Sequence, residues 1–89
     1  MDIQPAWSQA LTRLVRTEMQ MRGLSYDSLL TRLDGLGVAG YTAHTLRNKV
    51  ARGTFSAVFL AQVMIAMEVD SLQLNPLLFR EALASADRD

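Results

Sequence analysis

The chain has 89 residues, no cysteine, two prolines and a single histidine. Without cysteine no disulfide forms, so the packing of apolar side chains must stabilise the fold, and a structural zinc site lacks its usual ligands. The absence of cysteine also fits a reducing compartment, and we expect a cytoplasmic protein. No apolar run reaches the roughly 18 residues that a membrane-spanning helix needs. Residues 1–10 show no signal-peptide pattern, so we expect no association with a membrane.

Residues that commonly carry catalysis are few and far apart in this sequence. His44 is the only histidine, and the nearest carboxylate, Asp34, lies across a glycine-rich stretch. No serine stands in a nucleophile-elbow pattern, and the spacing of Gly35, Gly37 and Gly40 does not match a phosphate-binding loop. We therefore predict that the protein is not an enzyme and that it uses no cofactor and no metal.

Negative charge is missing from the middle third of the chain. The whole sequence is neutral, with nine Lys and Arg against nine Asp and Glu. Residues 35–67 nevertheless carry Arg47, Lys49 and Arg52 and no acid. Attraction to phosphate depends on this local field more than on total charge, so the segment indicates nucleic-acid binding. The alternative is that these three residues form an ordinary solvated helix face.

Helical periodicity and capping signals predict an all-α fold, a compact five-helix bundle in a single domain over residues 1–89. The expected helices span about 5–22, 25–35, 42–53, 56–67 and 75–85, with a core over about 7–83 and a frayed end at 86–89. Ser25, Thr42 and Asn75 are typical N-caps, and Gly23 is placed to end the first helix in the left-handed conformation.

The spacing of apolar residues predicts which faces point inward. Leu46 and Val50 lie four residues apart and give the third helix its inward stripe. We expect Leu36 and Val38, in the glycine-rich turn, to point inward as well. Trp7 is interpreted as a residue in or at the edge of the core.

The last two helices are the expected association surface. The fourth helix is apolar on nearly every face, so it is either the central helix of the bundle or partly covered by a partner. The fifth helix has an apolar face, and we expect it, with the exposed part of the fourth, to form a homodimer interface. The residues of that face are Leu78, Phe79, Ala82 and Leu83.

Three motifs carry a family resemblance. Residues 22–30 read R-G-L-S-Y-x-x-L-L, residues 45–53 read T-L-R-N-K-V-x-R-G, and residues 59–67 read F-L-x-Q-V-M-x-A-M. In this order they resemble the lambda-repressor-like (Cro-type) helix-turn-helix superfamily. The chain looks closest to a small bacterial domain family of unknown function with an R-N-K-x-x-R-G-x-F-S-A core, here Arg47–Ala57.

The resemblance implies a helix-turn-helix domain that binds double-stranded DNA, usually as a dimer on a two-fold site. The third helix would lie in the major groove, and the start of the second helix and the loop after the third would contact phosphates. By position, the candidates for base contact are Thr42, His44, Thr45, Arg47 and Asn48. The candidates for phosphate contact are Ser25, Tyr26, Lys49, Arg52 and Thr54.

Two functions follow as expectations. The first is sequence-specific DNA binding by a prokaryotic or phage transcriptional regulator. The second is a helix-turn-helix fold used for contacts with a protein partner, as in an adaptor, an antitoxin-like protein or a phage accessory protein. Neutral net charge and the apolar fourth helix favour the second, whereas the acid-free middle third favours the first.

Overall fold

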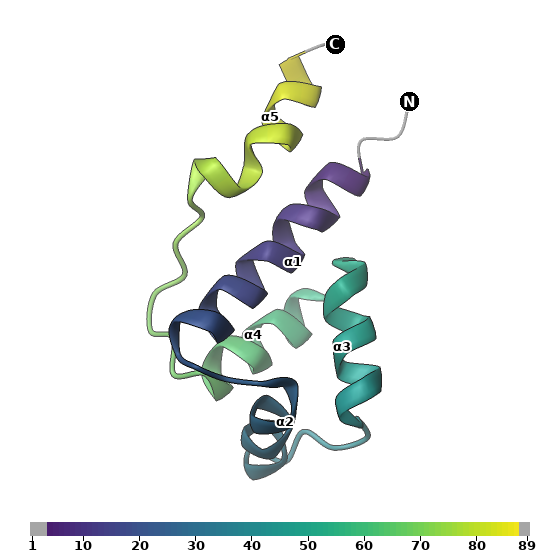
Figure 1. Cartoon of the computed structure of the whole chain (residues 1–89), viewed down its shortest axis with the longest axis vertical. Helices are drawn as coiled ribbons and strands as arrows, with labels where there is room; N and C mark the ends of the chain where they lie inside the picture. Colours follow the sequence, from purple (N-terminus) through teal and green to yellow (C-terminus); the bar gives the residue numbers. More distant parts are fainter. Residues whose placement is uncertain (1–3, 88–89) are drawn as a thin grey trace.

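The computed structural model describes residues 4–87, and these residues form five α-helices and one 3-10 helix with no strand. This confirms the predicted all-α fold. The elements are α1 (Gln4–Met21), α2 (Tyr26–Gly35), α3 (Ala43–Arg52), α4 (Ala57–Ala66), η1 (Pro76–Phe79) and α5 (Arg80–Asp87). Long α1 runs through the middle, with α3 on one side, α4 behind it, α2 at one end and α5 alongside its other end (Figure 1).

The helices begin at the predicted capping residues. Ser25 and Thr42 have extended backbones, and their hydroxyls accept hydrogen bonds from backbone N–H groups three residues on. Ser56 caps α4 in the same way. Gly23 follows α1 with φ 66°, the left-handed conformation predicted for it. Each cap satisfies backbone groups that a helix end otherwise leaves unpaired.

The end of α2 corrects one prediction about the turn. Val38 N–H donates to Leu33 O at 3.0 Å across Gly37, which has φ 82°. This hydrogen-bond pattern folds the residue after the glycine back onto the helix, so Val38 packs against the core as predicted. Leu36 instead occupies the C-cap position and is 49% exposed, so its predicted inward orientation is wrong.

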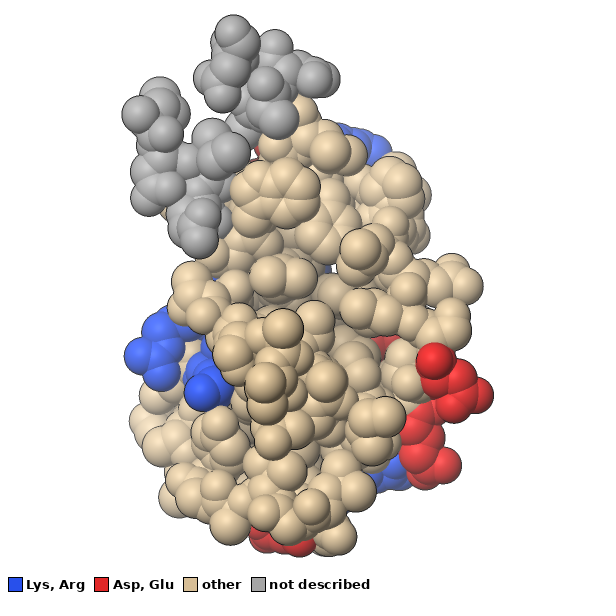
Figure 2. Space-filling model, turned by 180° about the vertical axis from the view of Figure 1, so that it is seen from behind, with Lys and Arg blue, Asp and Glu red and all other residues tan. Residues whose placement is uncertain are grey.

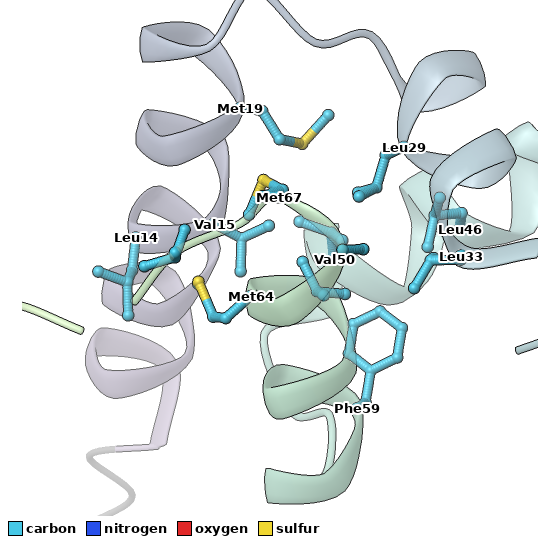
Figure 3. Packing of buried hydrophobic residues seen from close by; sticks show 13 residues of the cluster. Leu14, Val15, Met19, Leu29, Leu33, Leu46, Val50, Phe59, Met64 and Met67 are labelled. Atoms are coloured by element: carbon cyan, nitrogen blue, oxygen red, sulfur yellow. The ribbon is translucent and has the colours of Figure 1, made fainter. Parts of the chain in front are cut away.

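Side chains from α1, α2, α3 and α4 converge on a single apolar core (Figure 3). The predicted inward residues Leu46 and Val50 of α3 are fully buried, as are Leu29 and Leu33 of α2. The α1 and α4 residues that complete this core are Leu14, Val15, Met19, Phe59, Val63, Met64 and Ala66, together with Met67 and Val69 after α4.

Helix α4 is buried on one side and exposed on the other. Phe59, Val63 and Met64 point into the core, but Val58 is 67% exposed and Ile65 is 62% exposed. Because four helices share a small core, α4 has neighbours only on its inner side. The prediction of α4 as the central helix of the bundle is therefore wrong, and coverage of its outer side by a partner stays a prediction.

A close contact between α1 and α3 fixes the position of α3. The Thr12 hydroxyl is buried and donates to Val50 O at 2.6 Å. Gly53 ends α3 with φ 65°, and a Cβ there would lie 2.0 Å from Ser8 O. Only glycine allows the two backbones to approach this closely, so the last turn of α3 is held rigidly against α1.

The last helix packs on its own chain. Phe79 and Ala82 are buried, and the Phe79 ring lies 5.7 Å from that of Trp7 on α1. Trp7 is thus an edge-of-core residue, as predicted. Phe79 and Ala82 are not available on the surface as the predicted dimer interface, whereas Leu83 is 45% exposed and Leu78 is partly buried.

The predicted fifth helix is present, with its first turn a 3-10 helix, η1, capped by Asn75. Its α-helical part continues to Asp87, beyond the predicted end. Of the segment predicted to fray, residues 88–89 lie outside the described residues. Among residues 4–87, no helix combines the length and apolar character needed to cross a bilayer.

Candidate nucleic-acid interface

The outer face of α3 is polar and carries no carboxylate. Residues along an α-helix turn by about 100° each, so the face opposite buried Leu46 and Val50 consists of His44, Asn48 and Arg52. All three are exposed. The predicted candidates on α3 therefore share one accessible surface, with Arg47 and Lys49 on its two flanks.

His44 and Asn48 form a pair at the centre of this face. The Asn48 amide nitrogen Nδ2 donates to His44 Nε2 at 3.2 Å. An amide group has two N–H donors and one acceptor oxygen, so this bond occupies one donor. An asparagine that offers an N–H together with its side-chain oxygen can pair with N6 and N7 of adenine.

Arg47 lies on the flank of α3 that faces α1 and α2. Its guanidinium carbon is 5.3 Å from the centre of the Tyr26 ring, a cation–π contact. The Tyr26 hydroxyl accepts a hydrogen bond from Arg16 Nε of α1 at 3.2 Å. Two guanidinium groups from different helices thus share one tyrosine at the start of α2, and the tyrosine O–H can still donate outward. Such a set of donors suits a phosphate group.

Lys49 lies on the opposite flank. Its ammonium group is 5.1 Å from the centre of the Phe59 ring and 5.5 Å from that of Tyr41. These contacts place the charge at the edge between α3 and α4 and restrict the side chain's rotamers. Lys49, Arg52, Thr54 and Phe55 together line a shallow hollow just beyond the end of α3.

Three predicted contact residues already serve as helix caps. Thr42 and Thr45 exchange hydrogen bonds in a capping box, with Thr42 N–H donating to Thr45 Oγ1 at 2.8 Å and Thr45 N–H donating to Thr42 Oγ1 at 3.1 Å. The Ser25 hydroxyl accepts from Ser28 N–H at 3.1 Å. These hydroxyls position α2 and α3, so their part in any recognition is indirect.

Two arginines outside this surface have structural roles. Arg22 donates to Met67 O at 3.0 Å and Arg32 donates to Ala66 O at 3.2 Å, so both cap the carbonyl end of α4. In Figure 2, seen from the α4 side, basic side chains gather at the edge where α3 lies and acidic ones at the opposite edge. The basic α3 surface is therefore separate from the acidic edge.

The structure brings Arg16 and Tyr41 to this surface and places the buried ring of Phe59 beneath Lys49, and none of the three was predicted as a site residue. In the sequence Arg16 lies on a polar face of α1 that gives no sign of proximity to α3. Tyr41 and Phe59 are aromatic residues near a basic helix, and only this juxtaposition with Lys49 would have suggested them.

These features define a small all-α domain whose third helix presents a basic, acid-free surface with its flanking cations held over aromatic rings. The chain belongs to the family described as a domain of unknown function (DUF6471), whose model matches residues 7–72. No curated protein and no solved structure gives a match. The match covers α1 to α4 and ends before η1 and α5.

Proposed function

We propose that this domain binds double-stranded DNA as a lambda-repressor-like helix-turn-helix, with α3 in the major groove. The observation that carries the proposal is the outer face of α3, where the His44–Asn48 pair lies between cations on both flanks. DNA places phosphates on both sides of the major groove and base edges between them. A helix with amide and imidazole groups at its centre and positive charge at both sides complements that arrangement.

The residues divide into two roles under this proposal. Asn48 and His44 read base edges, with the remaining Asn48 donor and its oxygen suited to adenine. Arg16, Tyr26 and Arg47 on one flank and Lys49 and Arg52 on the other contact phosphates. The biological setting proposed is a prokaryotic or phage transcriptional regulator.

The first test is the salt dependence of binding to a pool of random DNA duplexes. Log affinity should fall linearly with log salt, with a slope of about −0.9 for each phosphate contact. The variants Arg47→Ala and Lys49→Ala should each reduce the slope by about one contact. Arg80→Ala on α5 is the matched control and should leave it unchanged. A folded protein that binds no duplex at low salt would sink the proposal.

The second test separates base reading from phosphate contact. After a preferred sequence has been selected from the pool, Asn48→Ala should lower discrimination between that sequence and random DNA by roughly 1–3 kcal/mol. The salt slope should stay as in the wild type, because no charge is removed. Equal losses on both DNAs would show that Asn48 does not read bases.

A competing function is a helix-turn-helix fold that binds another protein. The exposed apolar residues of α4, Val58 and Ile65, favour it. Contact with DNA phosphates needs charged and polar groups, whereas exposed apolar side chains that lie together are typical of protein interaction sites. Salt distinguishes the two functions, because the affinity for DNA falls as salt rises whereas an apolar protein contact is nearly insensitive to salt in this range.

A further inference from the structure

The outward side of α4 is an apolar stripe without a charged residue. Ala57, Val58, Ala61 and Ile65 are exposed and lie on one side of the helix, because residues at these spacings share a face. Val58 and Ile65 are among the most exposed large apolar side chains in the described part of the chain. Figure 2 shows an uncharged area in the middle of this side of the molecule.

The two ends of the stripe carry opposite charge. Lys49 and Arg52 lie at the edge where α4 begins, with no acid in residues 35–67. Glu68 and Asp70 follow the other end of α4 and are exposed. Figure 2 shows basic side chains at one edge of the uncharged area and acidic side chains at the other.

Arginine is also present near the acidic end, but it is turned toward the helix. Arg22 and Arg32 donate to the carbonyls of Met67 and Ala66, and their carboxylate partners are Glu18 and Glu68. The charges within each Arg–Glu pair cancel, so the net charge at this end of α4 is the negative charge of Asp70. The helix dipole adds in the same sense, positive where α4 begins and negative where it ends.

We propose that a second copy of this chain docks on the α4 stripe, with the two α4 helices antiparallel about a two-fold axis near Ala61. This arrangement places the basic end of each copy against the acidic end of the other, and Val58 of each copy packs near the far half of the opposing helix. A two-fold axis requires a surface that complements itself, and an apolar stripe with opposite charges at its ends does so. Ala61, small and central, lets the two helices approach closely.

The occupant is a second copy because charge and apolar area match within one chain. Two parallel α4 helices would place like charges together, so the antiparallel orientation is favoured. The stripe itself carries no charge that would select an acidic or a basic partner. One helix face is a small interface, so the dimer should form in the micromolar range and depend on concentration. The proposal does not rest on the proposed function, since it concerns the protein without DNA.

The test is sedimentation equilibrium over a range of protein concentration, without DNA. Wild type should pass from monomer to dimer, and Ile65→Glu should stay monomeric at every concentration. Met21→Glu is the matched control, because Met21 is an apolar helix residue outside the stripe and even more exposed than Ile65, and it should dimerise like wild type. Circular dichroism checks that each variant is folded, and Ala61→Arg takes the place of Ile65→Glu if the latter does not fold.

Charge reversal tests the antiparallel orientation. Arg52→Asp and Asp70→Arg should each weaken the dimer at low salt by at least several-fold, and the double variant should restore most of the affinity. Wild type that is monomeric at all concentrations, a dimer unaffected by Ile65→Glu and Ala61→Arg, or a double variant weaker than both single variants would overturn the proposal.

Discussion

Gly53 and Glu68 follow α3 and α4 in the same left-handed backbone conformation, with φ 65° and 61°. Gly53 also lies close to α1. Glycine is therefore required there for two reasons, the left-handed conformation and the lack of space for a Cβ beside Ser8. Glu68 has a β-carbon and an exposed side chain, and its conformation costs about 1–2 kcal/mol relative to glycine. The two residues therefore respond in opposite ways to substitution.

Gly53→Ala should lower the free energy of unfolding by about 2–5 kcal/mol, because it adds left-handed strain and a clash with the backbone of Ser8. Gly37→Ala is the control, since Gly37 has φ 82° but no atom within 4 Å of the added Cβ. It should cost only about 1 kcal/mol. Urea denaturation measures both, and equal losses would mean that the contact with α1 is unimportant.

Glu68→Gly should raise the free energy of unfolding by about 0.5–1 kcal/mol, the relief of strain less the entropy that glycine adds to the unfolded chain. Glu68→Ala keeps the Cβ and removes the exposed ion pair with Arg32, so it should change stability little. Thermal unfolding in dilute solution separates the two. A Glu68→Gly protein less stable than Glu68→Ala would contradict the explanation.

At the scale of helices, α5 differs from the other four. Its buried residue Ala82, with Phe79 of the preceding η1, packs against α1 near Trp7 but lies outside the main core, whose last residue is Val69. The family match also ends at residue 72, before η1 begins. Helices α1 to α4 are therefore expected to fold as a unit without the final segment.

A chain that ends at Gln73 should fold cooperatively and lose about 2–3 kcal/mol of stability, the contribution of burying Phe79 and its neighbours. Trp7 fluorescence should shift to longer wavelength, since the ring loses its aromatic contact. Leu83→Ala in the full chain is the control and should change little, because Leu83 is 45% exposed. Loss of the cooperative transition in the shortened chain would show that α5 is part of the core.

At the scale of the whole molecule, the neutral chain has strongly uneven surfaces. On the side of the molecule that α4 faces, Lys49 and Arg52 lie at one edge, Glu68 and Asp70 lie beyond the end of α4, and an apolar stripe separates them (Figure 2). The proposed DNA binding uses the outer face of α3 and the proposed self-association uses the α4 stripe, and Lys49 and Arg52, at the edge between them, take part in both. Net charge alone therefore says little about either.

If two copies associate through α4, the folded state should gain stability as protein concentration rises. The midpoint of thermal unfolding of the wild type should increase with concentration, because association stabilises only the folded chain. The midpoint of Ile65→Glu should be independent of concentration. Differential scanning calorimetry at several concentrations measures both, and identical behaviour of the two proteins would count against association through this stripe.

Much of the architecture could be predicted from the sequence because its signals are local. Caps such as Ser25 and Thr42, the left-handed Gly23 and the inward pair Leu46 and Val50 each depend on a few neighbouring residues. Helix spacing also places His44 and Asn48 on one face of α3. Whether this face contacts DNA stays a prediction.

Other features were decided only by the tertiary structure. The approach of Arg16 to Tyr26 joins α1 to α2, and Lys49 lies over Phe59 from the next helix, so neither contact is encoded in local spacing. Helix α4 is apolar on nearly every side and has no periodicity that marks an outer face. The sequence by itself therefore determined the helices and the polar outer face of α3, while tertiary packing decided that Val58 and Ile65 lie on the surface and that Phe79 is buried against Trp7.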